Sequence, residues 1–326
     1  MWAIIELFVN QYHLAVFFFV SGYFFSTSVA DHPKSFLWKK IKQLYFPFVI
    51  SGMSFLFLHN LLVKLNIYPS YIGYNYIGKE MVNLIVFLYS NDVLMGAMWF
   101  CISLLWVLFV ATAQSWVAKK WGGNLTVIIF ASILISSFLL QVLHLKSPYC
   151  IWQNTIITGV LWLGFYFRRE MEETINQISF IIRILLLLFC FISICIFTIW
   201  GISARLQAPA INNECISQIL IIAVLGCLMV FLMSNVLRGT YLGFIFSVIG
   251  KHSFSIMLLN YLCFNVVNLI QCIYYHYPFY TIAQHAIIPY KSPIWFFLYI
   301  LAGTAIPTLV SICYEDVKSK VMLWIS

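Results

Sequence analysis

Nine stretches of about 20 mostly apolar residues constrain this chain more than any other feature. A helix of about 20 apolar residues is long enough to cross the hydrocarbon core of a bilayer. The chain is 63% hydrophobic and only 9% charged, whereas about a quarter of the residues in a soluble domain are charged. The sequence therefore predicts an all-α fold, a polytopic membrane helix bundle formed by residues 1–326 as a single domain. The predicted spans are 3–28, 43–63, 97–117, 124–145, 149–167, 178–200, 214–236, 252–274 and 293–313.

A tenth apolar segment, residues 77–95, is too short to be a tenth span. It also carries the charged residues Lys79, Glu80 and Asp92. We expect it to form an interfacial or re-entrant helix.

The basic residues sort to one side of the predicted bundle. When the nine spans are threaded, 13 of the 18 Lys and Arg residues fall in loops on one side and five on the other. The side with more basic residues is cytoplasmic by the positive-inside rule, which places the C-terminus inside and Met1 outside. Because a ten-helix parent would have both ends inside, we expect that one helix precedes Met1 in a longer protein. The net charge of +8 therefore indicates membrane topology, and we expect no nucleic-acid partner.

The first span carries a polar stripe. Glu6, Asn10 and His13 are spaced i, i+4, i+7, so a continuous helix would place them on one face, and Ser21 continues the stripe. Polar groups inside a span face protein or water rather than lipid. The stripe is consistent with a hydrogen-bonding network between helices. It is equally consistent with a catalytic site, because histidine accepts a proton near neutral pH.

Two other spans carry polar stripes, and each is more typical of helix packing than of a site. Trp99, Ser103 and Trp106 share one face of the third span. Ser253, Asn260 and Asn268 share one face of the eighth.

The strongest basic cluster is DHPKSFLWKKIKQLYFP, residues 31–47. Lys39, Lys40 and Lys42 are typical of a topology signal that contacts lipid headgroups. Alternatively, they form a phosphate-binding patch at the cytoplasmic mouth of a cavity, and Arg168 and Arg169 could join it. Three nearby carboxylates weaken the case for the two arginines: Glu170, Glu172 and Glu173.

The sequence contains none of the common motifs for nucleotide binding, zinc binding or a serine nucleophile. There is no Walker loop, no GxGxxG, HExxH or GxSxG motif and no pair of carboxylates within a span. The nine cysteines show no CxxC spacing and lie mostly in apolar spans, so we interpret them as small buried hydrophobes rather than disulfides or metal ligands.

Three segments in order resemble the membrane acyltransferase-3 family, and most closely its fucose 4-O-acetylase-like branch, which acetylates bacterial surface polysaccharides. YHLAVFFFVSGYFF with KSFLWKKIKQLYFPFVI resembles the start of the family domain. AMWFCISLLW resembles its LWFL segment, and IGKHSFSIMLLNYLCF its GKNS segment. The residues that carry the match are His13, Phe17, Phe18, Phe19, Ser21, Gly22, Tyr23, Lys39, Lys40, Lys42, Pro47, Trp99, Phe100, Gly250, Lys251, Ser253 and Ile256, together with Pro307 in the last helix.

The resemblance implies a bundle of ten transmembrane helices in a bacterial inner (plasma) membrane. It also identifies two departures. The family's best-known histidine ends a first helix that would precede Met1, and Asn260 stands where many relatives have histidine. An amide can orient a hydroxyl but cannot act as a base.

The mechanism that the resemblance implies is O-acyl transfer to a sugar hydroxyl of a cell-surface polysaccharide. Acetyl-CoA or another acyl-CoA is the co-substrate, no cofactor stays bound, and the CoA phosphates would meet Lys39, Lys40 and Lys42. His13 would assist as base or orient the substrate with Glu6 and Asn10. The acceptor would contact Ser21, Trp99, Ser103, Ser253 and Asn260.

Two alternatives remain open. The chain could be a catalytically inactive remnant of the same fold, which the two departures favour. It could also belong to another class, such as a polysaccharide transporter, flippase or polymerase. Against that class, the sequence shows no paired internal repeats and no large external loop.

Overall fold

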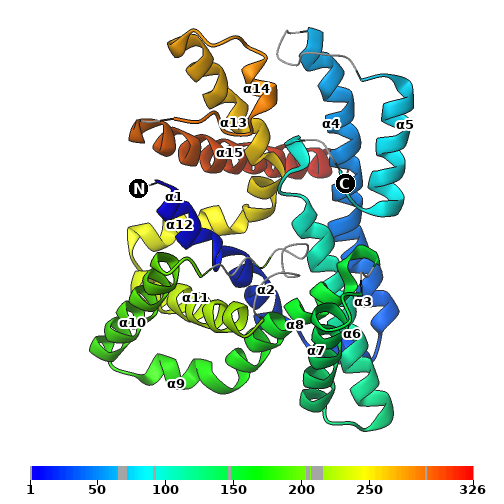
Figure 1. Cartoon of the computed structure of the whole chain (residues 1–326), viewed down its shortest axis with the longest axis vertical. Coiled ribbons are helices and arrows are strands. Elements are labelled where there is room, and N and C mark those ends of the chain that lie inside the picture. The colour runs from blue at the N-terminus through cyan, green and yellow to red at the C-terminus, as the bar shows by residue number, and fades with distance from the viewer. Residues whose placement is uncertain are drawn as a thin grey trace. The chain divides into compact units, whose positions relative to one another are not determined.

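The computed structural model describes residues 2–64, 72–90, 93–145, 148–202, 206, 216–290 and 292–325. These residues form helices and loops, with no β-strand among them (Figure 1). The all-α prediction is therefore confirmed. The α-helices among the described residues are α1 (Trp2–Asn10), α2 (His13–Tyr23), α3 (Pro33–Lys40), α4 (Phe46–Lys64), α5 (Tyr74–Val82), α6 (Trp99–Trp121), α7 (Leu125–Gln141), α8 (Ile151–Tyr166), α9 (Glu172–Gln177), α10 (Phe180–Ile199), α11 (Ile216–Leu237), α12 (Tyr241–Lys251), α13 (Ser253–Tyr275), α14 (Thr281–Gln284) and α15 (Pro293–Ile325).

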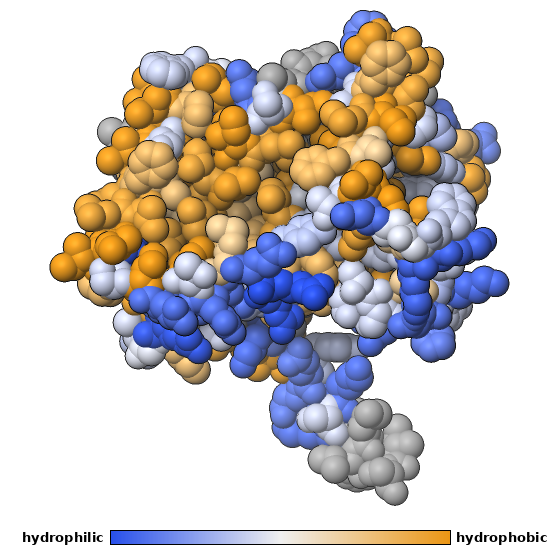
Figure 2. Space-filling model, turned by 90° about the horizontal axis from the view of Figure 1, so that it is seen from below, coloured by the Kyte–Doolittle hydropathy of each residue, from blue (hydrophilic) through white to orange (hydrophobic). Residues whose placement is uncertain are grey.

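Six helical segments among the described residues are long and apolar enough to cross a membrane. Much of the surface in Figure 2 is apolar, as lipid contact requires. The chain is thus an integral membrane protein, while the count of nine spans stays a prediction. The six segments are Pro33–Lys64, Trp99–Trp121, Phe180–Ile199, Ile216–Leu237, Ser253–Tyr275 and Pro293–Lys320.

The first predicted span differs from the expected single helix. It is divided into α1 and α2 by a turn at Gln11 and Tyr12. The Gln11 side chain is buried, and its amide donates a 2.7 Å hydrogen bond to Thr198 Oγ1 of α10. Tyr12 lies against Gly226 of α11, where a Cβ would come within 2.2 Å of the Tyr12 side chain. A buried polar side chain and a bulky ring thus occupy the turn, and the polar stripe is split between two helices.

The helices form two compact units. Unit 1 comprises residues 1–42 and 103–238, and unit 2 comprises residues 43–102 and 239–326. Whether the chain acts as one domain in the membrane stays a prediction.

Helix α8 is the centre of unit 1. Eleven of its 16 residues are buried, and it packs against α2, α7 and α11. Its contact with α2 is made by backbone: a Cβ on Gly22 would lie 1.7 Å from the Leu161 carbonyl oxygen, and a Cβ on Gly164 would lie 2.0 Å from that of Phe19. Small residues permit this close approach of helices in membranes.

Unit 2 is built on the packing of α13 against α15. Its apolar core comprises Val267, Trp295, Tyr299 and Ala302. The amide of Asn268 is fully buried at this contact: it accepts from the Tyr299 hydroxyl and the Ile288 N–H and donates to backbone carbonyls of residues 285 and 286. Asn268 therefore fastens the loop before α15 to α13, which is the structural role expected of its stripe.

The segment predicted as an interfacial or re-entrant helix contains α5, a π-helical turn at Asn83–Phe87 and a 3₁₀ turn at Val93–Met95. Asp92 lies outside the described residues. The position of the segment in the bilayer stays a prediction.

Candidate active site

Two adjacent cavities form a groove at one end of unit 1, where α2, α6, α7 and α8 end or begin. We call it the basic groove. Its cavities measure 430 and 520 Å³ and share Thr27 and Arg169 as lining residues. The first is lined mainly by Tyr23, Phe25, Ser26, Phe165 and Arg168. The second is lined mainly by Ser28, Asp31, Ser115, Lys119 and Gly123.

The two arginines of the basic groove are held in place by aromatic rings. The Arg168 guanidinium lies 5.1 Å from the Tyr23 ring centroid, and its Nη1 donates a 3.1 Å hydrogen bond to the Tyr23 carbonyl oxygen. The Arg169 guanidinium lies 5.1 Å from the ring centroid of Phe165. Each guanidinium has five N–H donors, so both arginines keep donors for a ligand.

Two of the carboxylates at or near the groove have partners. Asp31 pairs with Lys119, and Glu172 accepts a 2.7 Å hydrogen bond from the Tyr23 hydroxyl. Within the described residues, no carboxylate forms an ion pair with Arg168 or Arg169. The groove therefore places two arginines, free of ion pairs within the described residues, beside the hydroxyls of Ser26, Thr27 and Ser28. Arginine forks bind phosphate in such a setting.

The three lysines of the predicted phosphate patch do not line the two cavities. Lys40 Nζ lies 5.5 Å from the Phe36 ring centroid, and Lys42 Nζ lies 5.4 Å from that of Trp38. Lys39 is exposed at the end of α3. Lys40 and Lys42 thus lie over aromatic rings four residues earlier in the chain. In contrast, Arg168 and Arg169 line the groove.

The catalytic candidates are distributed over α1 and α2. His13 opens α2 and is half-buried, and its Nδ1 lies 3.1 Å from the Val9 carbonyl oxygen. Because a carbonyl only accepts, Nδ1 carries the proton in this contact, and in the neutral imidazole Nε2 then presents a lone pair. Glu6 is exposed on α1, and Asn10 ends that helix half-buried.

The predicted acceptor-binding residues are divided between the two units: Ser21 and Ser103 belong to unit 1, and Trp99, Ser253 and Asn260 belong to unit 2. Ser21 donates to the Phe17 carbonyl oxygen within α2, and buried Ser103 donates a 2.6 Å hydrogen bond to Asn154 Oδ1. Trp99 packs edge-on against Phe100. Ser253 begins α13, and the Asn260 Oδ1 accepts from the Tyr261 N–H.

Sequence reasoning missed a buried polar network behind the groove. Trp162 Nε1 donates a 2.7 Å hydrogen bond to Gln114 Oε1, and Gln114 Nε2 donates to Ser132 Oγ at 2.6 Å. A glutamine within a predicted span indicates that a polar partner lies nearby. The sequence does not identify that partner, because Ser132 and Trp162 lie 18 and 48 residues from Gln114.

It also missed Lys119, which lines the groove. In the sequence, Lys119 contributes only to the cytoplasmic charge count, because nothing in its local pattern marks it as a ligand.

By its fold and its site, this chain is an all-α integral membrane protein with a basic groove at the ends of several helices of unit 1. The sequence profile of an acyltransferase domain family matches residues 1–312. The chain therefore belongs to the membrane acyltransferase-3 family. No curated protein and no solved structure matches it.

Proposed function

We propose that this protein is a membrane O-acyltransferase that moves an acyl group, which we take to be acetyl, from acyl-CoA to a sugar hydroxyl of a cell-surface polysaccharide. The family supports membrane acyl transfer in general. The finer proposal includes the fucose 4-O-acetylase-like branch, the bacterial inner membrane and a cytoplasmic C-terminus, all of which rest on sequence resemblance and charge topology.

The basic groove is the observation that carries the donor assignment. Coenzyme A is a polyphosphate at one end and a thioester at the other. Arg168 and Arg169 offer unused guanidinium donors next to a row of hydroxyls. These groups suit the phosphates, and the groove lies on the side that the charge distribution predicts to be cytoplasmic.

His13 is the proposed proton acceptor or orienting group for the sugar hydroxyl. Its neutral Nε2 has the lone pair that a general base requires. Tyr23 lies ten residues further along α2, about 15 Å along the helix axis. The proposal therefore requires the pantetheine arm of the donor to extend along α2 from the basic groove toward His13.

The donor assignment predicts weaker binding when both arginines are removed. Hydrogen bonds to charged groups contribute about 1.5–3 kcal/mol each, and each 1.4 kcal/mol is a factor of ten in affinity. The Arg168→Ala/Arg169→Ala protein, which loses two such interactions, should therefore bind acetyl-CoA about 10²- to 10⁴-fold more weakly in isothermal titration in detergent.

The matched control is Lys39→Ala/Lys40→Ala, which removes two positive charges outside the cavities. It should leave the Kd within about threefold. If the lysine variant alone weakens binding, the phosphates bind at the lysine cluster and the basic groove is not the donor site. If neither variant changes the Kd, the donor assignment is wrong.

An inactive family member is the second candidate, and one observation favours it. Asn260 occupies the position where many relatives have histidine, and its side-chain oxygen accepts a hydrogen bond from the backbone of its own helix. Such a protein would bind the donor without transferring its acyl group.

A further inference from the structure

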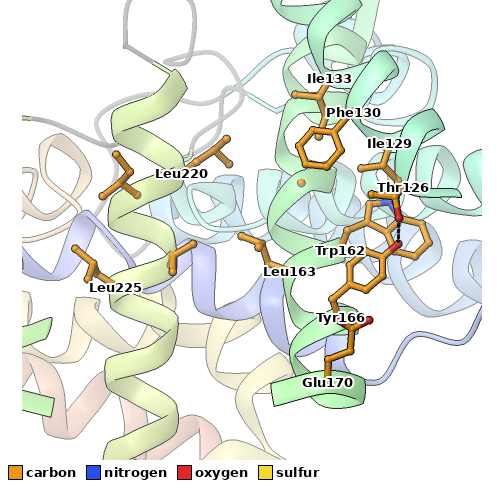
Figure 3. Close-up of a pocket in the computed structure, with 13 residues that line it drawn as sticks. Thr126, Ile129, Phe130, Ile133, Trp162, Leu163, Tyr166, Glu170, Leu220 and Leu225 are labelled. Atoms are coloured by element: carbon orange, nitrogen blue, oxygen red, sulfur yellow. Dashed lines mark hydrogen bonds between the residues drawn. The ribbon is translucent and has the colours of Figure 1, made fainter. Parts of the chain in front are cut away.

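An apolar groove separate from the basic groove lies within unit 1 between α7, α8 and α11 (Figure 3). Its volume is 650 Å³, and most of its lining residues are aliphatic. It follows α8 from Gly159 to Glu170, which is about 16 Å along the helix axis. In a membrane protein, a surface of this kind contacts hydrocarbon.

Gly159 gives the groove its depth. A Cβ at this position would lie 3.2 Å from Ile133 Cδ1 and 3.7 Å from Leu220 Cδ2. Any longer side chain at residue 159 would therefore occupy the space where the three helices approach one another.

The groove has polar groups at one end. The Thr126 Oγ1 and the Tyr166 hydroxyl are 2.9 Å apart and form a hydrogen bond between α7 and α8. Glu170, one turn beyond Tyr166, is exposed at the same end (Figure 3). The opposite end is formed by apolar residues such as Phe130 and Ile133.

A groove with one apolar end and one polar end fits a lipid that has a hydrocarbon chain and a polar head group. The apolar length fits one hydrocarbon chain. The hydroxyls and the carboxylate can exchange hydrogen bonds with a head group that carries several hydroxyls. A sugar hydroxyl can also donate a hydrogen bond to the exposed Glu170 carboxylate. The head group that suits this end is therefore a sugar.

We propose that the apolar groove binds the hydrocarbon chain of a lipid-anchored sugar, with the sugar at Thr126, Tyr166 and Glu170. The inference goes beyond the proposed function.

Gly164 of α8 packs against Phe19 and Tyr23 of α2. The sugar would therefore lie level with Tyr23, about 15 Å along α2 from the proposed base His13. The groove would hold a lipid-anchored sugar in the bilayer apart from the site of acyl transfer.

A photolabelling experiment tests the proposal without requiring acyl transfer. The full-length protein in phosphatidylcholine nanodiscs is irradiated with an alkyl glucoside that carries a diazirine on its chain. A phosphatidylcholine with a diazirine on one acyl chain is the comparison probe, and mass spectrometry locates the labelled residues. We expect saturable labelling of α7, α8 and α11 by the glucoside, abolished by excess unlabelled alkyl glucoside.

Two leucine-to-tryptophan variants provide a matched pair. Leu163 lines the groove on α8 and is 37% exposed, so an indole there would narrow it. Leu134 on α7 is 67% exposed and does not line it. Leu163→Trp should lower glucoside labelling at least fivefold, and Leu134→Trp should leave it unchanged. Should Leu163→Trp not fold, Glu170→Lys at the exposed polar end should likewise lower glucoside labelling relative to phosphatidylcholine labelling.

Equal labelling of the two tryptophan variants would overturn the proposal. So would equal labelling of the groove by the two probes, because the groove would then hold bulk bilayer lipid. Specific labelling in a protein that transfers no acyl group would instead count against the proposed function and leave the lipid site intact.

Discussion

Replacing His13 with alanine should lower the rate of acyl transfer by about 10²- to 10⁴-fold, the usual contribution of a general base. The expectation rests on the neutral imidazole, whose Nδ1 is engaged by the Val9 carbonyl oxygen and whose Nε2 is left as acceptor. The measurement is the initial rate of transfer from radiolabelled acetyl-CoA to polysaccharide by purified protein in proteoliposomes.

Two further variants separate the possible roles of His13. His13→Gln retains a hydrogen-bonding group but no base, so it should be as slow as His13→Ala if the imidazole accepts a proton. Partial activity in His13→Gln would show that the residue orients the substrate. His32→Ala, which removes an exposed histidine before α3, should keep full activity. A normal rate combined with a lower melting temperature in His13→Ala would mean that His13 is only a structural residue.

Replacing Gly164 with alanine should destabilise the protein by about 3 kcal/mol or more, at or beyond the upper end of the usual cost of overpacking. The added Cβ would lie 2.0 Å from the Phe19 carbonyl oxygen and 2.9 Å from the Tyr23 backbone nitrogen. Both neighbours are backbone atoms, so no side-chain rotation can relieve the clash, and α2 and α8 must separate. The thermal unfolding of the purified protein in detergent measures the effect.

Gly250→Ala is the matched control. Gly250 is also helical, and a Cβ there would meet no atom within 4 Å. Because alanine favours helix over glycine by about 1 kcal/mol, this variant should be slightly stabilised. Equal melting temperatures for the two variants would show that α2 and α8 do not pack through their backbones.

The helical membrane character of the chain could be predicted from its sequence because apolar length is a local property. The break at Gln11 and Tyr12 could not, because both residues fit a continuous apolar helix. The partners at the turn are Thr198, 187 residues from Gln11, and Gly226, 214 residues from Tyr12. Glu6 and Asn10 therefore lie on α1 and His13 on α2, and the i, i+4, i+7 spacing does not place the three on one face of a continuous helix.

The basic groove shows the same limit. Charge counting placed Arg168, Arg169 and Lys119 on one side of the membrane, which is all that a topology rule provides. Their arrangement around Ser26, Thr27 and Ser28 depends on the end of α8 lying beside the end of α2. In contrast, the Lys39 to Lys42 cluster is prominent in the sequence because its members are adjacent, and adjacency along a helix does not place them in a cavity.

The most direct test of the central claim is transfer of radiolabelled acetyl from acetyl-CoA to purified bacterial surface polysaccharide by the wild-type protein in proteoliposomes. We expect alkali-labile label on the polysaccharide, as an O-acetyl ester requires, at a rate that saturates with acetyl-CoA and is absent from empty liposomes. Binding of acetyl-CoA without labelled polysaccharide or any other acylated sugar would contradict the account and identify the protein as a family member that binds the donor but does not transfer its acyl group.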